Sequence, residues 1–265
     1  MIDSFDFTLS RYQQYLSAIK QSWDVISFNE INNDILNGKP KALIRHDIDL
    51  SLHQSLKMAK LEHEQGIKTT YFIHLQNEFY NALEIESQHV IRNIIALGHD
   101  IGVHFDINAY SKKINKSEDI DYWATFEKNI YEQLFNCNVS TLSFHNPTLT
   151  NIEFNQKIDN IGGMLNTYSR TIFDHFEYIS DSNGFWRFDE MYDFLEKNKK
   201  KNIQFLSHPG WWLNKDLKPR QKIEYHINLR AKNTLLSYDK CLESDNRLNI
   251  GKNDLIDKEC YDHNL

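Results

Sequence analysis

The sequence alternates short apolar or β-branched stretches with longer segments of helical spacing. The short stretches each predict a strand, and they are residues 42–44, 69–73, 99–104, 140–144, 164–168, 177–180 and 202–206. Most of the segments between them carry apolar residues three or four positions apart, which is the spacing of a helix with one buried face. Strands that alternate with helices form parallel sheets with the helices outside. The pattern therefore predicts an α/β fold.

The number of strands favours a barrel. Seven strand–helix units within 265 residues come close to the eight units of a full barrel. We therefore expect a distorted (β/α)7, TIM-like barrel in a single domain with a C-terminal helix, and an open, doubly wound sheet is the alternative. We place an N-terminal helical segment at 1–40, the barrel at 41–246 with a helix over 219–246, and a polar tail at 247–265.

Charge and composition exclude several classes of protein. The chain has 30 basic and 37 acidic residues, so its net charge of −7 gives no basic balance for nucleic acid. No stretch approaches the ~18 apolar residues of a membrane-spanning helix. The first residues are acidic where a signal peptide would be basic. The cysteines, Cys137, Cys241 and Cys260, form no CxxC pattern, which favours a reducing compartment. We expect a cytoplasmic protein.

Histidines and aspartates gather where four of the predicted strands end. In chain order they are His46, Asp47, Asp49, His104, Asp106, His145 and His208. Each one alone could be a cap, a turn residue or half of a hydrogen-bonded pair. In a parallel barrel, however, the carboxyl ends of all strands open on one face, where active sites lie. The sequence therefore predicts that these side chains converge on one pocket.

Clustered imidazoles and carboxylates without thiolates indicate a particular chemistry. Such ligands suit Zn²⁺, which is the metal we predict, and also Fe²⁺, Mn²⁺ or Co²⁺. A catalytic site of this kind keeps three protein ligands and an open position, and its metal lowers the pKa of water and polarises a carbonyl group. A further carboxylate can take a proton from the water, and a separate imidazole can protonate the leaving group. The set predicts hydrolysis of an amide or an ester.

Four segments carry a family resemblance over roughly residues 41–212, and they are LIRHDIDLS, ALGHDIGVHFD, SFHNP and FLSHPGWW. Together they resemble the polysaccharide deacetylase superfamily (NodB-like, carbohydrate esterase 4), in a divergent branch that carries HDxD. The resemblance implies a distorted (β/α)7 barrel, a divalent metal and removal of N-acetyl groups from amino sugars.

The resemblance also implies a role for each strand-end residue. Asp47 matches the catalytic base, and His208 matches the general acid that protonates the departing sugar amine. Asp49 and His104 match metal ligands. The family has a second histidine four positions after the first, where this chain has Asn108.

We therefore take His145 as the third ligand, with Asp106 and His46 as alternatives. The arginine that orients the base in the family's third motif has no counterpart in SFHNP.

The remaining candidates concern the substrate. We expect a sugar or sugar precursor to contact Tyr168, Asp181, Trp186, Trp211 and Trp212, with orientation of His208 as the alternative role of Asp181. The predicted function is N-deacetylation of an amino sugar in a surface-polysaccharide or lipopolysaccharide precursor, such as a nucleotide-linked or lipid-linked sugar. A metal hydrolase of another amide or ester, and a non-catalytic sugar-binding barrel, are the alternatives.

Overall fold

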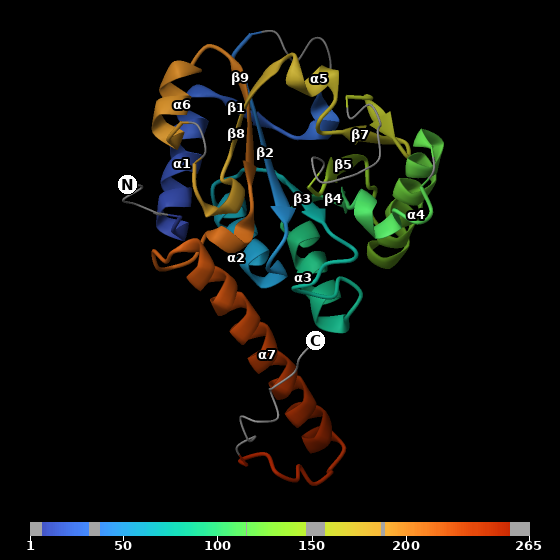
Figure 1. Cartoon of the computed structure of the whole chain (residues 1–265). Coiled ribbons are helices and arrows are strands. Elements are labelled where there is room, and N and C mark those ends of the chain that lie inside the picture. Colours follow the sequence, from blue (N-terminus) through green and yellow to red (C-terminus); the bar gives the residue numbers. More distant parts are fainter. Residues whose placement is uncertain (1–6, 32–37, 115, 147–156, 187–188, 255–265) are drawn as a thin grey trace. The chain divides into compact units, whose positions relative to one another are not determined.

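The structure is a computed structural model of the chain, and it describes residues 7–31, 38–114, 116–146, 157–186 and 189–254. The chain divides into two compact units, residues 1–226 and residues 227–265 (Figure 1). The helix α7 (Pro219–Ser244) begins in the first unit and ends in the second. All strands that the structure describes lie in the first unit, and so does the candidate site.

The described part of the chain forms one sheet. Its strands are β1 (Asp24–Ile26), β2 (Lys41–Ile48), β3 (Thr70–Ile73), β4 (Asp100–Phe105), β5 (Thr141–Phe144), β6 (Asn160–Ile161), β7 (Met164–Asn166), β8 (Phe176–Ser180) and β9 (Asn202–Ser207). The order is β6-β7-β5-β4-β3-β2-β9-β8, with β1 beside the first half of β2. The β6–β7 pair is antiparallel and the other pairs are parallel.

This order decides between the two predicted architectures. From β2 the strands add in one direction through β7, while β8 and β9 lie on the other side of β2, as they would on returning around a barrel. Within the described residues the two ends of the sheet, β6 and β8, do not pair with each other. The α/β class and the distorted, incompletely closed (β/α) barrel are therefore confirmed.

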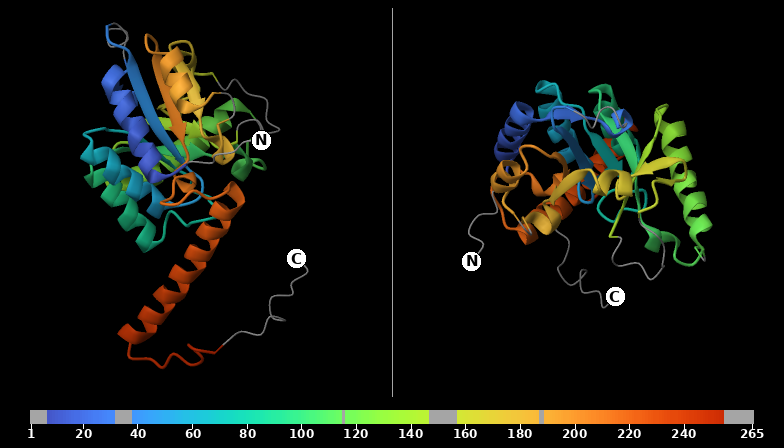
Figure 2. Two further views of the ribbon diagram at one scale, coloured as in Figure 1. Left: turned by 90° about the vertical axis from the view of Figure 1, so that its left-hand side faces the viewer. Right: turned by 90° about the horizontal axis from the view of Figure 1, so that it is seen from above.

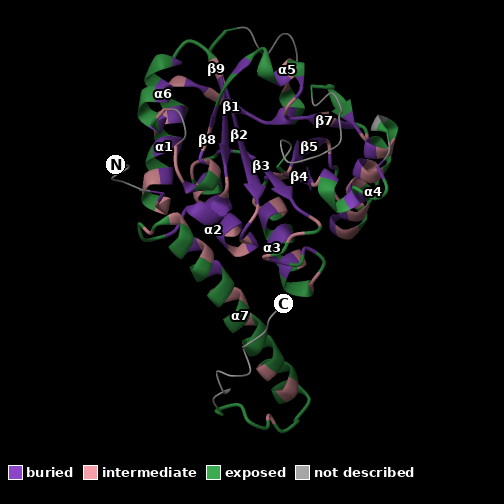
Figure 3. Ribbon diagram, viewed as in Figure 1, coloured by how far each residue is buried: buried purple, intermediate pink, exposed green. Residues whose placement is uncertain are grey.

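Helices cover the outside of the sheet in the first unit. They are α1 (Leu9–Ser22), α2 (Leu52–Glu64), α3 (Ile85–Ala96), α4 (Ser117–Phe135), α5 (Arg170–Phe173) and α6 (Met191–Lys197). Neighbouring helices contact one another in the order α6-α1-α2-α3-α4, and α1 and α4 flank the strands at opposite sides (Figure 2). Their outward faces are exposed while the strands are buried (Figure 3). No helix within the described ranges combines the length and apolarity needed to cross a membrane.

Alternating side chains of β2 separate two regions of the core. Ala42 and Ile44 pack outward with the helices, whereas Leu43 packs inward with Phe72 and Phe176. The barrel interior is crowded, because a Cβ at Gly102 would lie 2.5 Å from the ring of Phe72. Glycine at this position of β4 is therefore what lets the interior rings pack against the strand.

The structure corrects the predicted extent of the strand that becomes β2. The sequence predicts a strand over 42–44 with polar residues after it, but β2 continues to Ile48 and pairs with β3 from Arg45 onward. Successive side chains of a strand point to opposite faces. Asp47 therefore faces the barrel interior, and His46 faces the helices. Two short strands, β1 and β6, are also absent from the prediction. They have three and two residues, which is too few to show the alternation that marks a strand.

A buried hydrogen-bond network surrounds the outward side chain of His46. Its Nε2 lies 2.6 Å from Oε1 of Glu62, which also accepts a hydrogen bond from the hydroxyl of Tyr12. The other oxygen of Glu62 accepts hydrogen bonds from Thr69 at 2.8 Å and Tyr71 at 2.7 Å. Burial alone would raise the pKa of Glu62, but the charge and hydrogen bond of His46 outweigh it and lower the pKa to about 2. The network joins α1, α2, β2 and β3.

We expect Glu62→Gln to lower the free energy of unfolding by about 3 kcal/mol at pH 6. Because the folded-state pKa of Glu62 lies below its usual value of 4.5, this stabilisation is complete above pH 4.5 and is lost as the pH falls toward 2. Urea unfolding at pH 6 and pH 3 measures both effects. The exposed Glu64→Gln on the same helix is the matched control. A difference between wild type and Glu62→Gln that does not shrink at pH 3 would contradict this assignment.

Candidate active site

The ends of four strands supply one polar cavity of about 210 Å³ inside the first unit. Its lining includes Asp47 of β2, Asp49 just after β2, His104 of β4, His145 just after β5 and His208 just after β9. They lie together because these strands are parallel and end at the same face of the barrel. The structure thus brings the five principal candidates of the sequence into a single cavity.

Asp49, His104 and His145 form a triangle of ligand atoms. Nε2 of His104 lies 3.1 Å from Oδ1 of Asp49, and Nδ1 of His145 lies 3.2 Å from that nitrogen and 3.5 Å from that oxygen. A tetrahedral metal with bonds of about 2.0 to 2.1 Å has ligand atoms about 3.3 to 3.4 Å apart. Two imidazole nitrogens and a carboxylate oxygen at this spacing fit a divalent metal. Together they form the potential metal-binding cluster of the described residues.

The electrostatics of the triangle keep its carboxylate ionised. Burial alone would raise the pKa of Asp49, but hydrogen bonds from His104 and His145 hold it well below its usual range. Burial alone would likewise lower the pKa of His145, but its hydrogen bond to Asp49 raises it. An ionised carboxylate beside two imidazoles is the form that a divalent cation needs.

The side chain of Asp47 is 2 % exposed, and only one of its two carboxylate oxygens has a partner in the protein. Its Oδ2 accepts a hydrogen bond from Ser143 at 2.8 Å and lies 3.7 Å from Nη2 of Arg45. Its Oδ1 is buried without a hydrogen-bond partner among the described residues. A buried carboxylate oxygen normally has a partner, so this one is available to a molecule in the cavity.

Arg45 is a site residue that the sequence analysis missed. It is fully buried inside the barrel, donates a hydrogen bond to Thr167, and lies 4.8 Å from the ring centre of Tyr168. Burial would lower its pKa, but the charge of Asp47 raises it. Arg45 thus contributes a positive charge beside Asp47, and SFHNP contains no arginine that could do so. The sequence feature that could have revealed Arg45 is a charged residue directly after an apolar stretch, two positions before Asp47.

His208 and Asp181 form a second polar pair. Nδ1 of His208 donates a hydrogen bond to Asp181 at 2.6 Å, and the backbone N–H of His208 donates to the same carboxylate at 3.0 Å. Burial alone would lower the pKa of His208, but the charge of Asp181 raises it to about 9. Asp181 also accepts a hydrogen bond from the indole of Trp212 at 2.7 Å. With Nδ1 held by Asp181, the Nε2 of His208 is the nitrogen available to the cavity.

His74, which follows β3, is a second missed residue. Its ring packs on that of His145 with centres 4.6 Å apart, and its Nδ1 lies 3.3 Å from Nδ2 of Asn77. Oδ1 of Asn77 accepts two backbone N–H groups, so its Nδ2 must be the donor. Nδ1 of His74 is then the acceptor, and Nε2 carries the proton. Burial lowers the pKa of His74 to about 3. His74 therefore supports His145 as a neutral ring.

The structure separates the two alternative ligands from the triangle. His46 points to the helices and binds Glu62, so it is corrected from alternative ligand to structural residue. One oxygen of Asp106 accepts the backbone N–H of Asn108 at 2.8 Å, and the other lies 3.9 Å from Nε2 of His74. Asn108 is exposed. The triangle of ligand atoms that could hold a metal is completed by His145 of the loop after β5, and not by a residue of the loop after β4.

The predicted substrate residues fall into two groups. Tyr168 and Trp211 line the cavity. Trp212 is fully buried in the helix-side core and is corrected to a core residue. Trp186 is partly buried against that core, beside Phe7 and Trp212, and does not line the cavity. Asp181 is also fully buried, which assigns it to His208 instead of a sugar hydroxyl. An aromatic residue beside a strand end suits a core and a pocket equally well, and only packing distinguishes them.

Comparisons with known proteins give structural neighbours only. No protein-family model matches the sequence, and no curated protein matches it significantly. Among solved structures, a CE4 family pseudoenzyme from Bacillus anthracis matches 72% of this chain and 60% of its own, with 11% identity and a TM-score of 0.41. The matched region thus spans less than two thirds of that neighbour.

Two further neighbours are a family 4 acetyl xylan esterase from Clostridium thermocellum, in complex with a cobalt ion, and a family 4 carbohydrate esterase from Bacillus anthracis. The first has 13% identity, covers 73% of this chain and 84% of its own, and has a TM-score of 0.38. The second has 12% identity, covers 83% and 86%, and has a TM-score of 0.37. All three neighbours are proteins of carbohydrate esterase family 4. This is the family that the sequence motifs resemble. The descriptions of the fold and of the site above rest on the strand order and on the side-chain distances.

We expect the purified protein to bind about one divalent metal ion per chain. His104→Ala and His145→Ala should each lose it, because each removes one corner of the triangle. Elemental analysis of protein prepared without chelator, and again after incubation with Zn²⁺, measures the content. Asp106→Asn is the control, since Asp106 lies outside the triangle and should be dispensable. Loss of metal in Asp106→Asn with retention in His145→Ala would refute this ligand set.

Proposed function

We propose that this protein is a metal-dependent hydrolase that removes the N-acetyl group from an amino sugar. The observation that carries the proposal is the arrangement of three groups around one cavity: the metal-binding triangle, a carboxylate with an unpartnered oxygen, and a histidine oriented by a buried aspartate. The identity of the sugar precursor and the cellular location remain predictions of the sequence.

Asp49, His104 and His145 would hold the metal. When bound, a divalent ion of this kind polarises a carbonyl group and lowers the pKa of water. The chain supplies an ionised carboxylate and two imidazole nitrogens for it, at the spacing described above. His74 packs on the ring of His145, which is the more solvent-accessible of the two imidazoles in the triangle.

Asp47 is suited to act as the general base. Ser143 and Arg45 engage one of its oxygens and leave Oδ1 to take a proton from a water molecule in the cavity. Nη2 of Arg45 also lies 3.7 Å from Oδ2 of Asp47 and so helps to hold the carboxylate in place. In this arrangement Arg45 is a positioning residue, because it acts through Asp47.

His208 is suited to act as the general acid. Asp181 fixes the orientation and the tautomer of its imidazole, so that Nε2 carries a proton toward the cavity. A departing amine must gain a proton before the C–N bond breaks readily, whereas an alcohol from an ester depends less on an acid. A histidine held in this way therefore favours an amide substrate over an ester.

We expect Asp47→Asn and His208→Ala to lower kcat for acetate release by about 10² to 10⁴-fold. Asp181→Asn should lower it less, because it disturbs the orientation of His208 without removing the imidazole. The measurement is acetate release from a panel of N-acetylated amino sugars, with O-acetylated xylan fragments for comparison, by protein loaded with metal.

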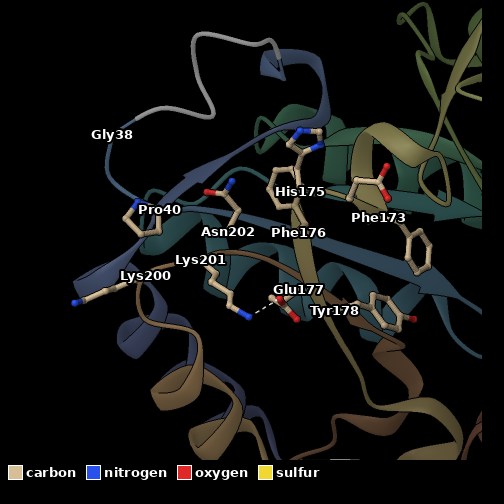
Figure 4. A pocket seen from close by; sticks show the side chains of 11 residues that line it. Gly38, Pro40, Phe173, His175, Phe176, Glu177, Tyr178, Lys200, Lys201 and Asn202 are labelled. Carbon is tan, nitrogen blue, oxygen red and sulfur yellow. Dashed lines mark hydrogen bonds and ion pairs between the residues drawn. The ribbon is translucent and has the colours of Figure 1, made fainter.

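Metal content serves as the control for these variants, since none of them removes a ligand of the triangle. Asp216→Asn, at an exposed aspartate outside the catalytic cavity and outside the two cavities beside β8, one of which Figure 4 shows, controls for the loss of an acidic residue. Full acetate release by metal-loaded Asp47→Asn would exclude Asp47 as the base. Release from O-acetylated xylan fragments alone would replace the proposed amide substrate with an ester.

A further inference from the structure

Two of the three corners of the metal-binding triangle lie beyond the ends of their strands. The pairing of β2 with β3 ends at Ile48 and Ile73, so Asp49 is the first residue after it. His145 likewise follows β5, whereas His104 lies within β4. Strand pairing therefore fixes His104, while the backbone of Asp49 and the ring of His145 depend on contacts from other segments.

The loop after β3 contains a side chain whose hydrogen-bonding capacity is fully used. Oδ1 of Asn77 accepts the backbone N–H groups of Phe79 at 2.7 Å and Tyr80 at 3.1 Å. Its amide nitrogen has two N–H groups to donate. Nδ2 of Asn77 lies 2.9 Å from the backbone oxygen of Asp49 and 3.3 Å from Nδ1 of His74. The amide is thus held by its own loop and donates in two directions.

The two donations of Asn77 lead to different corners of the triangle. The first reaches Asp49 directly, at the backbone oxygen of the residue whose carboxylate is a candidate ligand. The second reaches His74, whose ring packs on that of His145 with an interplanar angle of 33°. A hydrogen bond at Nδ1 fixes how the ring of His74 is turned, and that ring limits the positions open to the ring of His145. One side chain therefore acts on both Asp49 and His145.

Tyr80 strengthens the same link through its hydroxyl group. That hydroxyl donates to the backbone oxygen of Ile48 at 2.9 Å and accepts the backbone N–H of His74 at 3.0 Å. Nδ2 of Asn77 lies 3.5 Å from the same oxygen of Ile48. Burial raises the pKa of the Tyr80 hydroxyl, so the proton that it donates is retained. The ends of β2 and β3 are thus tied together by the loop that carries Asn77.

We propose that Asn77 is a positioning residue for the metal site, because it sets the position of Asp49 relative to His145. Asn77 does not line the catalytic cavity, so it acts through Asp49 and His74 and not on a substrate. Side chains that orient metal ligands typically change the affinity for the metal by about 10 to 100-fold when they are lost. This inference rests on the proposed function and specifies how its metal site is held in place.

The test removes the donor of Asn77 and keeps the acceptor. Asn77→Asp retains an oxygen for the backbone N–H groups of Phe79 and Tyr80, but it presents a second oxygen, which cannot donate, to Asp49 and His74. The metal-free full chain is titrated with Zn²⁺ in competition with a chelating dye. We expect the affinity for Zn²⁺ to fall by about 10 to 100-fold. The added negative charge would by itself strengthen cation binding, so a weaker affinity reports the lost hydrogen bonds.

Asn81→Asp is the matched control. Asn81 lies in the same loop, and its Oδ1 accepts the backbone N–H of Leu83, two residues later, at 3.0 Å, as Oδ1 of Asn77 does with Phe79. Asn81 is exposed and does not line the catalytic cavity. Its substitution adds the same charge, and the affinity for Zn²⁺ should stay close to that of the native protein.

The absorption spectrum of the Co²⁺-loaded protein separates a displaced ligand from a general loss of stability, because the visible bands of Co²⁺ depend on the geometry of its ligands. Asn77→Asp should change these bands, and Asn81→Asp should not. Tyr80→Phe removes only a hydroxyl group and should lower the affinity for Zn²⁺ less than Asn77→Asp does. Thermal unfolding of each metal-free variant checks the fold. If Asn77→Asp does not fold, Tyr80→Phe provides the test.

Native affinity and a native Co²⁺ spectrum in Asn77→Asp would overturn the role of Asn77. Equal losses in Asn77→Asp and Asn81→Asp would do the same, and so would native affinity in Tyr80→Phe where that variant provides the test.

Acetate release from N-acetylated amino sugars by the native protein separates this inference from the proposed function. Metal binding that depends on Asn77, without acetate release, would leave the metal site and remove the deacetylase activity. Acetate release together with native affinity in Asn77→Asp would leave the activity and remove the role of Asn77. A native protein that binds no Zn²⁺ would remove both.

Discussion

The buried pairing of Glu62 with His46 lies on the opposite face of β2 from the candidate active site, and its hydrogen bonds continue to the neighbouring strand. Nδ1 of His46 lies 2.7 Å from the hydroxyl of Ser207 on β9. His46 immediately precedes Asp47, and Ser207 immediately precedes His208. The relative position of the candidate base and acid therefore depends on a network on the opposite face of the sheet.

A charged group inside a protein is tolerated only when it is paired and hydrogen-bonded. β2 meets this requirement on both of its faces. On the inner face Arg45 lies beside Asp47, and on the outer face His46 binds Glu62. Glu62 also binds Tyr12 of α1 and Tyr71 of β3. The same requirement thus determines how these helices and strands surround β2.

Much of the fold could be predicted from the sequence because long elements repeat their pattern several times. The helix after Ser51 begins there as expected, since Ser51 accepts the backbone N–H of Gln54 and caps α2. Polar residues at the strand ends also predicted the cavity, because parallel strands end at one face. The orientation of His46 could not be predicted, since it depends on whether β2 stops at Ile44 or continues to Ile48.

The third candidate ligand could be predicted from the order of the strands, whereas His74 could not. Neighbouring strands lie only about 4.8 Å apart, so the end of β5 is as close to His104 as the loop that follows His104 itself. With Asn108 four positions after His104, the sequence indicates His145 as the third candidate ligand, and its Nδ1 lies 3.2 Å from Nε2 of His104. His74 follows β3 in the same manner, but a single histidine after a strand carried no pattern to single it out.

The position of β9 in the sheet has a consequence for how the site comes together as the chain folds. The metal-binding triangle needs only residues 49–145, from strands that pair with their neighbours in chain order. His208 joins them only when β9 reaches β2, across the 161 residues that separate His46 from Ser207. Closing so long a loop is a slow, entropically costly event. As the chain folds, the three residues that could hold a metal therefore come together before His208 joins the cavity.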